Sequence, residues 1–306
     1  MTFMPSPFSI PYTSREVNAR AQPGRVFYVD AGIGDNDNSG IRPDEAFLSI
    51  IYALTQVRVD ANDYIIVLVS GEAAWPVTIG AAHSRVHILG STNPPGLGQY
   101  LSPTGVADEP AFLIDNGSDT VEIAGFNLGA GNTHACIEVE SSQRDWIHHC
   151  WFGNSDQGLG TPAYGIQAPT GACGFLVVED CLFLGDQVNV GQGISINGID
   201  ITAGAWMTIR RNRFMGCTIG VRIRACTGSM VLDNVFACPD VQGAAITLVA
   251  HAATTGCMIT GNAAMEGAET AMAANPFEDL NAADINHWGN NTTTFAGGVE
   301  QAHRPA

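Results

Sequence analysis

The sequence has few positively charged residues: 13 Lys and Arg face 30 Asp and Glu, which gives a net charge of −17. Such a balance opposes binding to nucleic acids and to anionic membranes, and it favours solubility. No apolar stretch is long enough to cross a membrane, so we expect no membrane insertion. The first residues lack a basic segment followed by an apolar run. We therefore expect no secretion signal and a product made in the cytosol.

Cysteine pairs with the spacing of a zinc site are also missing, because no two cysteines are separated by two residues. Eight cysteines are present, and several recur at equivalent positions of the repeat described next. Buried free cysteine behaves as a small apolar residue, so we expect stacked reduced thiols rather than disulfides. The sequence assigns no metal-binding, cofactor-binding or catalytic residue.

A six-residue block recurs along the chain with a mean spacing of about 27 residues, which is typical of a solenoid. In each block an apolar residue is followed, three positions later, by a small or polar residue, and two positions after that by another apolar one. The blocks are Ile123–Leu128, Ile147–Phe152, Val178–Phe183, Ile209–Phe214, Val231–Phe236 and Ile259–Ala264.

A second column in each repeat has a small residue followed by an apolar, variable, apolar pattern. Its members are Cys136–Val139, Gly165–Ala168, Gly193–Ile196, Gly220–Ile223 and Ala245–Leu248. Alternation with a period of two predicts strands. The leucine-dense consensus of leucine-rich repeats is absent, and hexapeptide repeats are far shorter. The sequence therefore predicts an all-β fold, a right-handed parallel β-helix solenoid.

The flanking segments predict four regions. Residues 1–23 contain four prolines and no periodicity, so we expect an extended N-terminal attachment arm. Residues 24–60 form an entry strand and a capping helix, 61–270 the β-helix, and 271–306 a C-terminal cap and tail that covers the last coil. The helix is expected from the helical spacing of Phe47, Ile50, Ile51, Leu54 and Val57.

The opening of the solenoid resembles a known class of proteins. It consists of the strand Val26–Asp30, a polar loop, the helix, and then the strand segments Ile65–Glu72, Val77–Ile79 and Val86–Ser91. This order is similar to right-handed parallel β-helix proteins of the pectate-lyase-like class, particularly phage tailspike, fibre and related virion proteins. The resemblance covers roughly residues 26 to 270. It implies the fold, but the same opening occurs in enzymes and in structural proteins.

Two polar patterns are interpreted as structural. Asn212, Asn234 and Asn262 occupy one column of the repeat, where stacked side-chain amides can hydrogen-bond to one another. Residues 35–40 imitate the first half of a calcium-binding EF-hand loop through Asp35, Asp37, Ser39 and Gly40. Ala46 stands where that loop needs a glutamate, so we interpret the segment as a polar turn.

Carbohydrate-cleaving β-helices use carboxylates, or calcium-bound carboxylates with a basic residue, on an outward strand face. The candidate carboxylates here are Glu138, Glu140, Asp145, Glu179, Asp180 and Asp233. Their candidate basic partners are Arg210, Arg211, Arg213, Arg222 and Arg224. His148 and His149 lie together without a recognisable metal-partner spacing, and alternation predicts one imidazole outward and the other toward the wall. Solenoid surfaces also carry such charges for solubility alone.

Two functions remain open at this point. The first is a bacteriophage virion protein without intrinsic catalysis: a homotrimeric β-helical spike, fibre or head-decoration protein. It would contact capsid or tail proteins through its arm, and a host surface glycan. The second is a polysaccharide-degrading enzyme, a lyase or glycoside hydrolase. Trp146, Trp151 and Trp206 fit trimer or wall packing under the first hypothesis, and stacking on sugars under the second.

Overall fold

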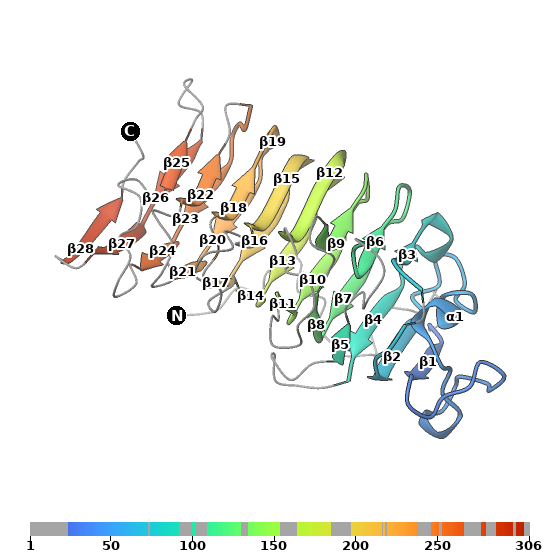
Figure 1. The fold of residues 1–306 in the computed structure, drawn as a ribbon. Helices are drawn as coiled ribbons and strands as arrows, with labels where there is room; N and C mark the ends of the chain where they lie inside the picture. The colour runs from blue at the N-terminus through green and yellow to red at the C-terminus, as the bar shows by residue number, and fades with distance from the viewer. Residues whose placement is uncertain are drawn as a thin grey trace, which may run out of the picture.

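The computed structural model describes residues 24–72, 74–91, 99–101, 109–129, 134–153, 164–184, 197–215, 217, 219–237, 246–250, 253–265, 277–279, 286–295 and 298–302. These residues form a right-handed parallel β-helix, in which three sheets run along the solenoid (Figure 1). No helix among them is long and apolar enough to span a membrane.

We name the three sheets A, B and C. Sheet A contains, in spatial order, β1 (Val26–Asp30), β2 (Tyr64–Val69), β4 (His87–Gly90), β7 (Glu122–Ala124), β10 (Trp146–His148), β13 (Val177–Glu179), β16 (Thr208–Arg210), β20 (Met230–Leu232), β23 (Met258–Thr260) and β26 (His287–Gly289).

Sheet B contains β3 (Val77–Ile79), β6 (Phe112–Ile114), β9 (Ala135–Val139), β12 (Tyr164–Gly174), β15 (Asn197–Ala205), β18 (Ile219–Ile223), β22 (Ile246–Ala250) and β25 (Phe277–Asp279), with β19 (Cys226–Thr227) paired to β15. Sheet C contains β5 (Gln99–Leu101), β8 (Phe126–Leu128), β11 (Trp151–Phe152), β14 (Leu182–Leu184), β17 (Arg213–Met215), β21 (Val235–Ala237), β24 (Ala263–Met265), β27 (Asn291–Phe295) and β28 (Gly298–Ala302).

The core consists of columns of identical or similar side chains, one from each coil. The first residue of each repeated block pairs in parallel register with its counterpart in the next coil, and all six are at most 1% exposed: Ile123, Ile147, Val178, Ile209, Val231 and Ile259. On sheet C the rings of Phe152, Phe183, Phe214 and Phe236 stack with centroids 4.5 to 4.8 Å apart. This spacing matches that of neighbouring strands, so each coil continues the column of the previous one.

The second predicted column needs a correction in two coils. Gly193–Ile196 lie outside the described residues, and the strand that pairs with Ile166 and with Val221 contributes Ile199 instead. In β22, Leu248 rather than Ile246 pairs with Val221. Apolar residues alternate over a longer stretch than one strand at both places, so the pattern alone offers more than one register.

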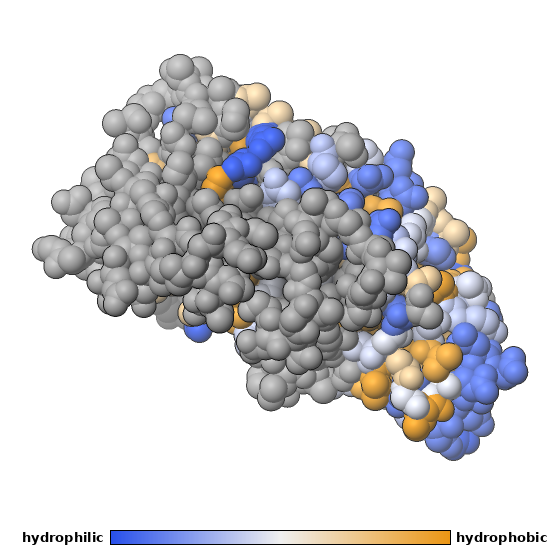
Figure 2. Space-filling view, in the orientation of Figure 1, coloured by the Kyte–Doolittle hydropathy of each residue, from blue (hydrophilic) through white to orange (hydrophobic). Residues whose placement is uncertain are grey.

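A short helix packs at the N-terminal end of the solenoid. The helix α1 (Ile50–Leu54) is shorter than the predicted one, because Phe47 forms a bridge with Val29 and Ser49 caps the first turn by accepting a hydrogen bond from Tyr52 N–H. Short 3₁₀ turns lie at Pro43–Glu45 and Ala81–His83. Figure 2 shows hydrophilic side chains gathered at this N-terminal end, with apolar ones exposed among them.

At the C-terminal end, parallel pairing continues past residue 270. β25, β26 and β27 add one more strand to each sheet, and β28 then pairs antiparallel with β27. The described residues after 276 therefore contribute a further coil, in which β28 pairs with the edge of β27, while the expected cover over the last coil stays a prediction. The four-region division and the attachment arm at residues 1–23 stay predictions, because the arm lies outside the described residues.

The predicted asparagine ladder is confirmed and is one residue longer. Asn212, Asn234, Asn262 and Asn291 are fully buried at the corner between sheets A and C. Each side-chain NH₂ donates to the next Oδ1 along the column, at 3.0 to 3.1 Å. Each of these acceptor oxygens also accepts the backbone N–H of the preceding asparagine. In coils where the column holds Cys150 and Cys181, these thiols are buried and form no disulfide, as expected.

A second buried corner contains Asp145, which is fully shielded from solvent. Its Oδ1 accepts Val121 N–H at 3.0 Å, and its Oδ2 contacts Ser142 Oγ. Ser142 has one hydroxyl proton, which it donates to Ser118 O at 2.9 Å. Ser142 Oγ can then only accept a hydrogen bond from Asp145, which requires that the carboxyl group carries a proton. Burial raises the pKa of Asp145 to about 7, against the hydrogen bond from Val121 N–H.

We predict that Asn234→Ala lowers the stability of the fold. The substitution removes the acceptor of two Asn212 groups. The buried backbone N–H of Asn212 is left without a partner, at about 1–3 kcal/mol, while its side-chain NH₂ keeps only the hydrogen bond to Val178 O. Thermal unfolding at a fixed scan rate measures the effect. Asn116→Ala, at an exposed turn, is the matched control. Equal midpoints for the two variants would contradict a stabilising role for the ladder.

We also predict that Asp145 makes stability depend on pH. Its folded pKa of about 7 lies above the unfolded value of about 3.9, so the folded state binds more protons between these values. Its contribution to stability is therefore present at low pH and is lost as pH rises through 7. Asp145→Asn keeps both hydrogen bonds without titrating. Denaturation curves from pH 5 to 8 should show the wild type losing stability relative to this variant, and parallel curves would refute the assignment.

Candidate functional site

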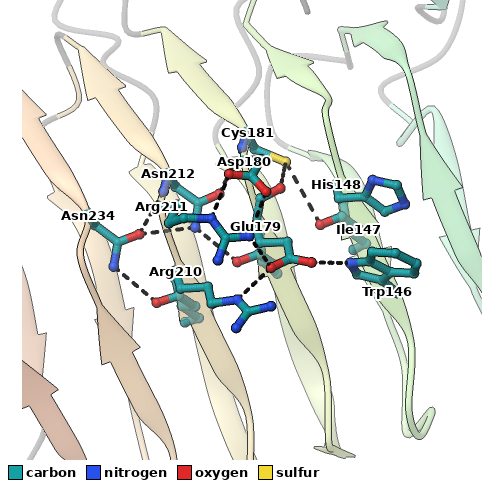
Figure 3. Close-up of polar contacts among 12 residues, drawn as sticks. Trp146, Ile147, His148, Glu179, Asp180, Cys181, Arg210, Arg211, Asn212 and Asn234 are labelled. Carbon is teal, nitrogen blue, oxygen red and sulfur yellow. Dashed lines mark hydrogen bonds and ion pairs between the residues drawn. The ribbon is translucent and has the colours of Figure 1, made fainter. Parts of the chain in front are cut away.

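The candidate site lies on the outer face of sheet A, where several coils present polar side chains. The inward residues of β4, β7, β10 and β13 form the isoleucine and valine column, so their strand neighbours point outward. This alternation places His87, Glu122, His148 and Glu179 on one surface. Figure 3 shows the part of this surface around Trp146, Glu179 and the two arginines.

Glu122 joins two histidines from the neighbouring coils. Its Oε1 accepts His148 Nε2 at 2.8 Å, and its Oε2 contacts His87 Nδ1. Burial raises the pKa of Glu122, but the hydrogen bonds from His148 and His87 outweigh burial and lower the pKa to about 2. Glu122 is therefore an ionised carboxylate at neutral pH, although only 4% of it is exposed.

Glu179 is the second outer carboxylate, and it is also held by donors. Trp146 Nε1 donates to its Oε1 at 2.9 Å, while Arg210 Nε and Arg211 Nη2 donate to its Oε2 at 2.5 and 2.7 Å (Figure 3). Only 6% of Glu179 is exposed. Glu179 is thus bound to two guanidinium groups and to the Trp146 indole at once.

Aromatic rings connect the two carboxylates and extend the surface. The Trp146 ring stacks on His148 with centroids 3.9 Å apart, so one side chain contacts the Glu122 group and donates to Glu179. At the N-terminal side, Tyr64 stacks on His87 at 4.2 Å. The polar surface is thus continuous from β2 to β16.

The corner after sheet A supplies the exposed rim of the site. His149, Asp180 and Arg211 occupy the same corner position in three consecutive coils, each with a left-handed backbone at φ of 52° to 55°. His149 Nδ1 lies 2.7 Å from His148 Nδ1. Arg211 donates to both carboxylate oxygens of Asp180 at 2.9 and 2.7 Å, and 45% of its side chain is exposed. The corner therefore presents an imidazole beside a guanidinium.

The pKa values of His149 and Asp180 at this rim are both lowered, but for different reasons. Burial lowers the pKa of His149, and the neighbouring His148 lowers it further, against the opposing charges of Asp180 and Glu179. Burial raises the pKa of Asp180, but its hydrogen bonds from Arg211 outweigh burial and keep it below the ordinary value. At neutral pH His149 is therefore a neutral imidazole next to an ion pair.

The structure brings together only part of the predicted set of charged residues. Glu179, Asp180, Arg210, Arg211, His148 and His149 meet on and beside sheet A. The others lie elsewhere: Glu138 on β9 with His134, Glu140 after β9, Asp145 in its buried turn, Asp233 at an exposed corner, Arg213 on β17, Arg222 on β18 and Arg224 after β18. The expectation that one imidazole of the pair points toward the wall is not met, because His148 lies on the outer face and His149 at the exposed corner.

Tyr64, His87 and Glu122 belong to the site but were missed in the sequence. His87 and Glu122 immediately precede Ile88 and Ile123, just as Trp146 precedes Ile147. The register of the isoleucine column could have placed them on one face, although it says nothing of how the side chains pair.

The loop of residues 35–40 is a polar turn, as interpreted from its sequence. Asp35 Oδ1 accepts Asp37 N–H at 3.0 Å, Ser39 Oγ donates to Glu45, and Gly40 N–H donates to Glu45 O at 2.8 Å. Over the part of the chain that the structure describes, no group of three or more His, Cys, Asp or Glu side chains is arranged to hold a metal ion.

The three tryptophans have different environments. Trp146 is part of the site, whereas Trp151 lies on β11 of sheet C with its Nε1 buried and without a hydrogen-bond partner. Trp206 is 59% exposed at the corner before sheet A, next to Phe175 of the preceding coil, which is 41% exposed.

Comparison with models of known protein families finds no match, and comparison with curated proteins finds none either. Solved structures do match. An alginate lyase from Paenibacillus sp. str. FPU-7 superposes with a TM-score of 0.50 and 14% identity, over 83% of this chain and 95% of the lyase.

Two further matches have lower scores. They are the GH136 lacto-N-biosidase from Eubacterium ramulus (TM-score 0.47, 11% identity, 88% of this chain) and a pectate lyase from Xanthomonas campestris (TM-score 0.39, 12% identity, 80% of this chain and 75% of that enzyme). The chain spans about 60% of the length of the lacto-N-biosidase. At these identities the likeness concerns the fold alone, and the fold is the pectate-lyase-like parallel β-helix.

Proposed function

We propose that the protein is a polysaccharide-cleaving enzyme, and that it works at the outer face of sheet A. One observation carries the proposal. Histidine, arginine and carboxylate side chains from consecutive coils converge on a surface that the solenoid does not need for its core. Glu122, His148 and Glu179 are each less than 10% exposed there, because they are covered by one another and by Trp146. Such preorganised polar groups are typical of catalytic sites.

The pairing of the carboxylates favours elimination over hydrolysis. A glycoside hydrolase needs a protonated carboxyl group as general acid, usually one with a raised pKa. Glu122 has a pKa lowered to about 2, and Glu179 is bound by two arginines. Glu122 therefore carries no proton at neutral pH, and both oxygens of Glu179 already accept hydrogen bonds from Trp146 and the two arginines. A lyase needs instead a base and a positive charge that stabilises the carboxylate of a uronate as the proton beside it leaves.

The composition restricts what that base can be. The chain contains no lysine, and arginine stays protonated at all ordinary pH values. Histidine is therefore the nitrogen base that this surface offers, and Arg211 at the rim is the charge that a uronate can reach. The proton on the carbon beside the carboxylate leaves, its electron pair forms a carbon–carbon double bond, the glycosidic C–O bond breaks, and the leaving oxygen takes up a proton.

The net charge of −17 repels a polyanion at long range, which acts against such a substrate. Salt limits this repulsion, because the Debye length is about 8 Å at physiological ionic strength. Arg210 and Arg211 lie within that range of the site, where they offset the charges of Glu179 and Asp180. This chain has a fold similar to that of an alginate lyase, with 14% sequence identity, and that similarity is consistent with the proposal.

The proposal departs from the sequence-based expectation of a virion protein without catalysis. That expectation rested on the arm, the absence of a secretion signal, the acidic surface and the lack of a recognisable catalytic cluster. The polar groups that meet on sheet A argue against the last of these. The virion location, the parallel homotrimer and the contacts of residues 1–23 with capsid or tail proteins stay predictions, and so does the likeness to tailspikes.

The test is depolymerisation by the purified protein. We expect alginate, polygalacturonate or a glucuronate-containing polymer to be shortened, with ultraviolet absorbance from an unsaturated product, and a neutral glucan to stay intact. Glu179→Gln removes the carboxylate that Arg210 and Arg211 share and should lower kcat/KM about a hundredfold. Glu138→Gln, on sheet B, is the matched control and should keep full activity. Intact polymers throughout, or cleavage without an unsaturated product, would contradict the proposal.

A further inference from the structure

Three side chains from two consecutive coils form a line from the interior of the site to its rim. Glu122 Oε1 accepts from His148 Nε2 at 2.8 Å, and His148 Nδ1 lies 2.7 Å from His149 Nδ1. The Trp146 ring stacked on His148 fixes the plane of the central imidazole. Only the outer member, His149, is exposed.

We propose that this line is a hydrogen-bond relay. His149 Nε2 is the catalytic base, and His148 and Glu122 are positioning residues that orient it. The inference rests on the proposed function for its substrate, a polymer containing uronate. It assigns a role to each ring nitrogen, and that assignment follows from the hydrogen-bond chemistry.

The ionised Glu122 can only accept hydrogen bonds, so His148 Nε2 must carry a proton. In the proposed relay His148 is neutral, which places its lone pair on Nδ1. His149 must donate to that lone pair through Nδ1–H, because the two Nδ1 atoms are hydrogen-bonded. A neutral His149 with its proton on Nδ1 has its own lone pair on Nε2. Glu122 thus sets the tautomer of His149 from two residues away.

The proton balance of the step is closed. His149 Nε2 takes the proton from the carbon beside the uronate carboxylate, and the electron pair of that C–H bond forms the double bond as the C–O bond breaks. The Nδ1 proton of His149 then points at His148, which is bound to the negative Glu122. The proton on Nε2 passes to the leaving oxygen, and the relay returns to its starting state.

The groups that face His149 come from three elements. They are His148 on β10, Glu179 and Asp180 at the end of β13, and Arg211 after β16. Burial and His148 keep the His149 pKa below its ordinary value, so the base is available at neutral pH and is lost in acid. The rate should fall as the pH drops below about 6.5.

The corner backbone suggests the best substitution. His149 has a φ of 52°, and Gly125 and Gly261 occupy equivalent corners of other coils. His149→Gly therefore removes the imidazole without straining the turn. We expect kcat to fall by about 10²- to 10⁴-fold, and added imidazole to restore part of it. His134→Ala on the side of sheet B is the control and should keep wild-type kcat.

Glu122→Gln tests the positioning role. Its amide can donate to His148 Nε2, which moves the His148 proton to Nδ1 and turns His149 into the tautomer with Nε2–H. We expect a lower kcat with little change in KM, and no rescue by imidazole. A merely structural role would not produce this pattern.

A readout independent of activity is the ¹⁵N NMR spectrum of histidine-labelled protein at neutral pH. The His149 signals, assigned by their loss in His149→Gly, should show an unprotonated Nε2 in the wild type and a protonated Nε2 in Glu122→Gln. A protonated Nε2 in the wild type, or full kcat in His149→Gly, would overturn the relay. A wild type that cleaves no polysaccharide would overturn the proposed function, while the NMR tautomers would still decide the relay.

Discussion

Parallel pairing between successive coils is the constraint on which the whole structure depends. Each strand of a coil pairs in register with the same strand of the next, so a residue type chosen for one coil is placed directly beside its equivalents. The phenylalanine stack and the asparagine ladder both follow from this. Rings with centroids about 4.5 Å apart, and amide N and O atoms about 3 Å apart, both require equivalent side chains on neighbouring coils to lie one strand spacing apart. The fold is in effect a set of columns rather than one globular core.

The same constraint builds the site. Inward columns must be apolar or, like the asparagine ladder, hydrogen-bonded along the column. Outward columns are free of this limit, so a solenoid can collect reactive side chains on one face by changing one residue in each of several neighbouring coils. Glu122, His148 and Glu179 come from three coils, yet they share one surface and are nearly buried by their partners. The left-handed corner that follows sheet A turns His149 and Arg211 out to the rim.

The sequence predicted the fold through this repetition, because the Ile123 to Ile259 column and Asn212 to Asn262 hold one register across coils. It predicted less where the apolar alternation is longer than one strand, as at Ile246 and Leu248. The site was predicted only in part. Glu179 and Arg211 were recognised as charges that could pair, but Glu122 and His87 precede apolar residues in segments without any motif. Their hydrogen bonds depend on side-chain directions across coils, which a one-dimensional pattern does not contain.

The central claim is that a uronate polymer lies along the outer face of sheet A, with a carboxylate at Arg211 and a sugar carbon at His149. A crystal structure of the His149→Gly protein soaked with an oligouronate tests it most directly. The account predicts a saccharide over β10, β13 and β16, with one carboxylate bound by Arg211. A saccharide bound on sheet B or sheet C, with the outer face of sheet A empty, would contradict it.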